Sequence, residues 1–120
     1  MNFLVVDDSA TMRKIVGVAL SGAGYAYEEA ENGKVGLEKA HAKKFDCVIL
    51  DVNMPEMNGI EFLKARAGDA AIKGIPVIVL TTQDEEALKN EALGLGAKDF
   101  LVKPFQKDGL LSAVAAALRT

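Results

Sequence analysis

An apolar run that ends on a single carboxylate most constrains how this chain can fold. Residues 47–50 are all apolar, Asp51 follows them directly, and Pro55 and Gly59 then mark a loop. A continuous apolar run of this length is typical of a strand covered on both faces, as in a parallel sheet. The pattern therefore predicts a buried strand that holds the Asp51 carboxylate at its carboxyl end.

Three other apolar runs end on polar side chains in the same way. Residues 3–6 are followed by Asp7 and Asp8, residues 77–80 by Thr81, and residues 100–102 by Lys103. Residues 25–30 form a weaker strand, in which Glu28 and Glu29 interrupt the apolar pattern. Charged residues of this kind suit an exposed edge, so we expect this strand to lie outermost.

Helical patterns separate the predicted strands, with apolar residues at i, i+3, i+4 and i+7. Ser9 or Thr11 is the expected N-cap of the first helix, and Asp84 that of the fourth, which Gly94 and Gly96 close. Five strands that alternate with five helices predict a doubly wound α/β fold: a parallel sheet, right-handed crossovers and helices on both faces. The pattern fills residues 1–120 as one domain, and we expect no output domain.

The carboxyl ends of parallel strands share one edge of the sheet, where ligands bind in such folds. We therefore expect Asp7, Asp8, Asp51, Thr81 and Lys103 to converge there. Carboxylates this close disfavour one another's ionisation unless a cation lies among them, and ligands that are all oxygen suit Mg²⁺. An Asp carboxylate can itself accept a phosphoryl group. The alternative is a salt-bridge cluster that merely ties the strand ends together.

Composition excludes several other classes of function. The net charge of −3 argues against nucleic acid as a partner, and the apolar runs are far shorter than the ~20 residues of a membrane span. Cys47 lies in an apolar run, as a core side chain in a reducing compartment does. His41 has no metal ligand at suitable spacing and is expected on the surface. We expect a cytoplasmic protein.

Four segments together resemble one family. They are Phe-Leu-Val-Val-Asp-Asp-Ser from Phe3, Leu-Asp-Val-Asn-Met-Pro-Glu-Met-Asn-Gly from Leu50, Leu-Thr-Thr from Leu80, and Val-Lys-Pro-Phe from Val102. They look like the receiver domains of two-component response regulators, and the segment from Asp7 to Val16 is most similar to single-domain, chemotaxis-type regulators of the CheY kind. The resemblance implies a flavodoxin-like sheet with strand order 2-1-3-4-5.

The resemblance also implies a role for each residue at the predicted edge. Asp51 would accept the phosphoryl group, Asp8 would bind Mg²⁺ directly, Asp7 would act on the metal largely through water, Asn53 would bind it through its backbone carbonyl, and Thr81 and Lys103 would bind the phosphoryl oxygens. The Lys103–Pro104 peptide would be cis. Phe100 stands where chemotaxis regulators usually carry a tyrosine, and without the hydroxyl its inward position needs no polar partner.

The implied activity is that of a signalling switch and not of an enzyme, since the domain assists only its own phosphorylation and dephosphorylation. A sensor histidine kinase would be the phosphodonor, and a downstream protein would dock on the face made by the fourth helix, the last strand and the last helix. A monomer is expected. The alternatives are a phosphorelay shuttle or phosphate sink and, from another class, an aspartyl-nucleophile phosphatase, although Asn53 stands where that enzyme needs a second acid.

Overall fold

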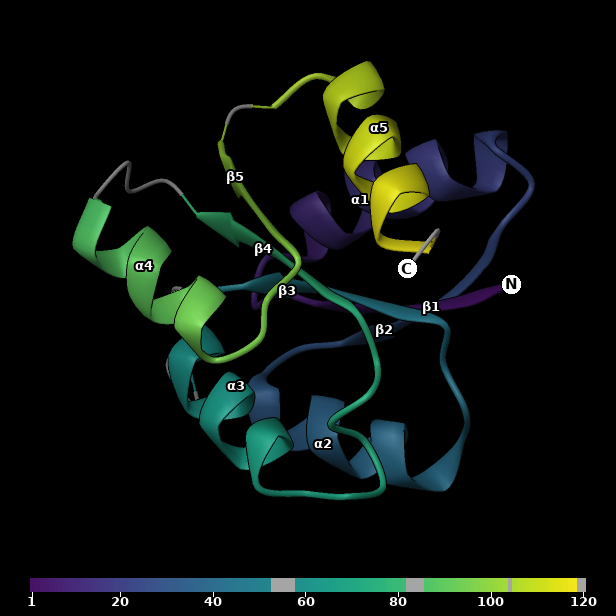
Figure 1. Ribbon diagram of the computed structural model, residues 1–120. Helices are drawn as coiled ribbons and strands as arrows, with labels where there is room; N and C mark the ends of the chain where they lie inside the picture. Colours follow the sequence, from purple (N-terminus) through teal and green to yellow (C-terminus); the bar gives the residue numbers. More distant parts are fainter. Residues whose placement is uncertain (53–57, 82–85, 104, 119–120) are drawn as a thin grey trace.

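The computed structural model describes residues 1–52, 58–81, 86–103 and 105–118 (Figure 1). Three predictions fall outside these ranges. They are Asn53 as a metal ligand, Asp84 as an N-cap, and a cis peptide at Pro104, and all three stay predictions.

Five strands alternate with five helices along the chain. The strands are β1 (Asn2–Val6), β2 (Ala26–Ala30), β3 (Cys47–Asp51), β4 (Val77–Thr81) and β5 (Asp99–Val102). The helices are α1 (Ala10–Gly22), α2 (Gly33–Ala42), α3 (Gly59–Ala67), α4 (Glu86–Gly94) and α5 (Lys107–Leu118). The predicted strands and helices are thus confirmed, with shifts of one residue where β1, β2 and β5 begin and where β4 ends.

All neighbouring strands are parallel, and their order is β2-β1-β3-β4-β5. The predicted flavodoxin-like order is therefore confirmed, and β2 with its two glutamates lies at an edge. The pairing sets Val6 beside Leu50 and Asp51 beside Leu80. The residues that follow β1 and β3 thus emerge side by side at one edge of the sheet.

Side chains that alternate along the strands supply two separate cores. Leu4, Leu50 and Val79 point to one face, where they pack with residues of α2, α3 and α4. Phe3, Ile49 and Ile78 point to the other face and pack with residues of α1 and α5. Figure 1 shows α1 and α5 on one side of the sheet and α2 and α3 on the other. Strands covered on both faces explain why their sequences are continuously apolar.

Local side chains and one glycine define the helix ends. The Ser9 hydroxyl accepts a hydrogen bond from the Met12 amide at 3.2 Å, so Ser9, rather than Thr11, is the N-cap of α1. After α4, Gly96 adopts a φ of 101°, a left-handed conformation that glycine takes without a steric cost. None of the helices within the described ranges is long and apolar enough to cross a membrane.

Candidate functional site

Three carboxylates meet at the carboxyl edge of the sheet. One oxygen each from Asp7, Asp8 and Asp51 lies within 4.8 Å of the others. Asp7 and Asp51 are only 2% and 3% exposed, whereas Asp8 faces solvent. The predicted convergence of these acids is therefore present in the fold, with Asp8 on the open side.

Backbone contacts position the two buried acids. The Ser9 amide donates to Asp7 Oδ1 at 2.9 Å, which orients the Asp7 carboxylate in the turn before α1. Beneath Asp51, a Cβ on Gly59 would lie 2.7 Å from the Asp51 carbonyl oxygen, closer than real side chains come. Gly59 therefore lets α3 begin directly against the end of β3.

Lys103 brings a positive charge to the buried acids. Its Nζ lies 3.1 Å from Asp7 Oδ2 and 3.2 Å from Asp51 Oδ1, and its side chain is 12% exposed. The Lys103 backbone amide donates to the Thr81 carbonyl at 2.6 Å, so β4 holds the residue in place. One ammonium thus stabilises two carboxylates that would otherwise repel each other.

The donor set fits a hard divalent cation. Asp7, Asp8 and Asp51 offer carboxylate oxygens only, and no thiolate or imidazole lies in the cluster within the described ranges. Mg²⁺ prefers such ligands and keeps part of its water shell, for which the exposed side of Asp8 leaves room.

Thr81 and Phe100 lie on the neighbouring strands β4 and β5. Thr81 is fully buried at the end of β4. Phe100 pairs with Val79, which lies two residues before Thr81 on β4. Phe100 is 9% exposed and belongs to the core cluster that contains Ala92 and Ala97. The ring therefore already lies inward, as expected for a residue without a tyrosine hydroxyl to solvate.

One arginine at the site did not stand out in the sequence. Arg13 Nη1 donates to the Asp7 carbonyl at 2.6 Å, and its Nε contacts Glu29 Oε1 at 2.8 Å. The guanidinium thus ties the turn after β1 to the edge strand β2. The sequence feature that could have indicated this role is its position one turn into α1, six residues after Asp7.

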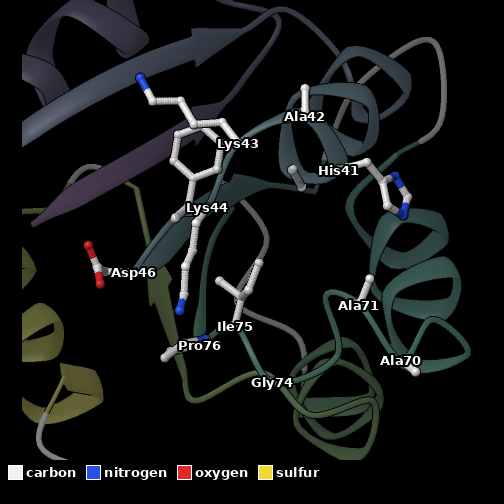
Figure 2. Close-up of a pocket in the computed structure, with 12 residues that line it drawn as sticks. His41, Ala42, Lys43, Lys44, Asp46, Ala70, Ala71, Gly74, Ile75 and Pro76 are labelled. Carbon is white, nitrogen blue, oxygen red and sulfur yellow. The ribbon is translucent and has the colours of Figure 1, made fainter.

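Other titratable groups lie away from the cluster. Cys47 is fully buried, which confirms its prediction as a core side chain. Burial raises the pKa of its thiol to about 12, so the thiolate that reacts is disfavoured. His41 is exposed and pairs with Asp69. It lines a cavity of about 570 Å³ between the end of α2 and the segment before β4. Figure 2 shows His41 on one side of this cavity and Asp46 on the other.

Comparison with known proteins agrees with this architecture. A family model described as the response regulator receiver domain matches residues 3–115. The chain is 41% identical to the chemotaxis protein CheY1 of Helicobacter pylori, with 100% of the chain and 98% of the relative covered. It is 37% identical to the protein PilH of Pseudomonas aeruginosa, with coverages of 96% and 95%.

Longer relatives and solved structures match as well. The phosphate regulon regulator PhoB of Pseudomonas aeruginosa is 39% identical over 97% of the chain, which spans about half (51%) of that protein. Among solved structures, the chemotaxis protein CheY4 of Vibrio cholerae superposes with a TM-score of 0.91 at 41% identity, with 98% of each chain covered.

Proposed function

The chain belongs to the response regulator receiver domain family of two-component signalling, and from this premise we propose that it accepts a phosphoryl group on Asp51. The observation that carries the proposal is the buried Asp51 carboxylate, held 3.2 Å from Lys103 and clustered with Asp7 and Asp8. Similarity to CheY1 and PilH over nearly their full lengths supports a chemotaxis-type receiver that works as a single domain.

The proposed step is a transfer from a phosphohistidine of a sensor kinase. An Asp51 carboxylate oxygen attacks phosphorus, the new O–P bond forms as the donor's N–P bond breaks, and the released imidazole takes up a proton. Lys103 Nζ, which contacts Asp51 in this structure, exchanges that contact for a phosphoryl oxygen. The Thr81 hydroxyl donates a second hydrogen bond, so both groups act on charge that the transferred phosphoryl brings.

Asp7, Asp8 and Asp51 would hold Mg²⁺, and Asn53 would add its backbone carbonyl. When bound, the ion would supply positive charge to the phosphoryl oxygens. Asp7 and Asp8 would supply carboxylate oxygens to the site. The hydrogen bond from Arg13 to the Asp7 carbonyl fixes the turn that carries both residues.

The proposed output is a change in the face made by α4, β5 and α5. Thr81 is the last residue of β4, and it pairs with Val102 on β5. A hydrogen bond from Thr81 to the phosphoryl group therefore pulls on the strand that borders this face. Because Phe100 is already buried, the movement needs no large rotation of that ring. A downstream protein would recognise the altered face.

Intact-mass measurement after incubation with Mg²⁺ and acetyl phosphate tests the acceptor. We expect the parent chain to gain one phosphoryl unit and Asp51→Asn to gain none. Asp108→Asn, which removes an acid in the first turn of α5, is the matched control and should gain as much as the parent. A full gain in Asp51→Asn would refute the assignment of Asp51.

A further inference from the structure

A nearly buried arginine lies at the opposite edge of the sheet, where the strands begin. Arg66, in the last turn of α3, is 6% exposed. Its Nε and Nη2 donate to the Ile75 carbonyl at 3.0 and 2.7 Å, and its Nη1 donates to the Leu95 carbonyl at 3.5 Å. Each of these partners is a neutral carbonyl oxygen.

The described part of the chain provides no carboxylate partner for Arg66. Buried cations in proteins are normally paired with an anion, because carbonyl dipoles replace only part of the lost hydration. Burial accordingly lowers the pKa of the Arg66 guanidinium below its usual value. A guanidinium also has five N–H donors, and the carbonyls occupy three of them.

Arg66 borders a cavity of about 540 Å³ whose other charged groups are also basic. Lys73, from the segment before β4, and Lys98, from the segment before β5, line it, and none of the described residues in its lining is acidic. Neither lysine has an ion pair within the described ranges. Gly74 and Gly94 also line the cavity, and a Cβ at either would meet no atom within 4 Å. Three cations therefore surround open space.

The neighbouring cavity in Figure 2 shows the contrast. There His41 pairs with Asp69, Lys43 pairs with Glu28, and Asp46 accepts a hydrogen bond from the Asn2 amide. Most of its charges are thus already satisfied within the protein, whereas those of the Arg66 cavity are not.

Two helices end near the Arg66 cavity, and their free carbonyls would repel an anion. After α4, however, these carbonyls have partners. The amides of Leu95, Gly96 and Ala97 donate back to the carbonyls of residues 91–93, and the positive φ of Gly96 permits this return. Arg66 itself binds the Leu95 carbonyl. The positive charge of the three side chains therefore dominates the cavity.

We propose that the cavity lined by Arg66, Lys73 and Lys98 binds a small anion with two or more negative charges, of which pyrophosphate is the simplest probe. Two N–H groups of Arg66 remain for its oxygens, and the two lysines supply mobile ammonium groups at the rim. The cavity opens at the amino edge of the sheet, so binding needs neither Mg²⁺ nor Asp51.

Isothermal titration with pyrophosphate in metal-free buffer tests the proposal, with acetate at equal ionic strength as the monovalent comparison. We expect pyrophosphate to bind the parent chain more tightly than acetate. Lys73→Gln combined with Lys98→Gln should weaken binding about tenfold or more, since each charge contributes on the order of 1 kcal/mol near a surface. Lys34→Gln with Lys89→Gln removes the same charge at exposed positions and should change the affinity by less than about twofold.

A second variant avoids any change to the buried arginine. Gly94→Glu places a carboxylate in open space and should abolish binding without loss of thermal stability. The proposal is overturned if pyrophosphate binds no tighter than acetate, or if the Lys73/Lys98 variant binds as well as the parent.

Discussion

The two edges of the sheet compensate buried charge in different ways. At the carboxyl edge, three carboxylates cluster and one ammonium lies between the two buried ones. At the amino edge, Arg66 is buried against carbonyl oxygens, and two further cations line the same cavity. The two buried acids thus lie where the strands end, and the buried arginine lies where they begin.

Helix direction accounts for this separation. In a parallel α/β fold the helices begin at the carboxyl edge and end at the amino edge, so partial positive charges face the acids and partial negative charges face the cations. Here α1 begins just after Asp8, and α3 ends just after Arg66. The acidic carboxyl edge is therefore compensated within the molecule by Lys103. At the basic amino edge, Arg66 is bound by two backbone carbonyls, and its cavity has room for an anion.

The largest effect expected from this difference between the two edges is at Lys103. Lys103→Met removes the ammonium shared by buried Asp7 and Asp51, so the free energy of unfolding in metal-free buffer should fall by about 3 kcal/mol. Mg²⁺ should restore much of the loss, since it binds the folded state in place of the missing charge. Urea denaturation with and without Mg²⁺ measures both effects. Lys89→Met, on an exposed position, is the control, and an equal loss in the two variants would contradict the prediction.

A substitution of Thr81 tests whether a phosphoryl group at the acidic edge changes the structure of α4 and β5. Thr81→Ala should still accept phosphoryl on Asp51, but it loses a charge-assisted hydrogen bond that contributes about 1.5 to 3 kcal/mol. Chemical shifts of α4 and β5 amides, recorded with beryllofluoride and Mg²⁺ as a phosphoryl mimic, should therefore change much less than in the parent. Thr11→Ala removes an exposed hydroxyl and should respond fully. A full response in Thr81→Ala would exclude this route.

A substitution of Arg66 tests how much the basic edge contributes to stability. Arg66→Met leaves the Ile75 and Leu95 carbonyls without their donors but also removes a desolvated charge, so the net loss of stability should be about 1.5 kcal/mol. Hydrogen exchange should accelerate in residues 95–98, where Arg66 contacts the end of α4, and not in residues 3–6. Lys64→Met, exposed on the same helix, should leave both segments unchanged; uniform acceleration would indicate global destabilisation instead.

The smallest effect concerns Asp69, near the basic edge. Its hydrogen bond with His41 lowers the pKa of the Asp69 carboxyl below the ordinary value of 3.8. Because the folded pKa is depressed, the stabilisation is present above the unfolded pKa and is lost as the pH falls through the lower folded value. Asp69→Asn keeps an acceptor for the Ala71 amide. Its urea midpoint should therefore lie below that of the parent near pH 5.5 and approach it near pH 2.5; a constant gap would contradict the role of this pKa.

Much of the fold and of the acidic site could be predicted from the chain alone. Asp7, Asp8, Asp51, Thr81 and Lys103 each follow an apolar run, and parallel pairing forces such positions to one edge of a sheet. The period of the apolar residues and the direction of the strands are enough to bring these side chains together. Asn53 stays a prediction, because it lies outside the described residues.

The roles of Arg13 and Arg66 were decided only by the tertiary structure. Arg66 follows Phe62 and Leu63 along the buried face of α3, where a charged residue was a signal that could have been noticed. Its partners, however, are backbone carbonyls of residues 9 and 29 positions away, and any residue type supplies a carbonyl. The meeting of side chains at strand ends can therefore be predicted from a sequence. The partner of a cation bound to backbone oxygen cannot, because the packing of the segments determines which carbonyl lies beside it.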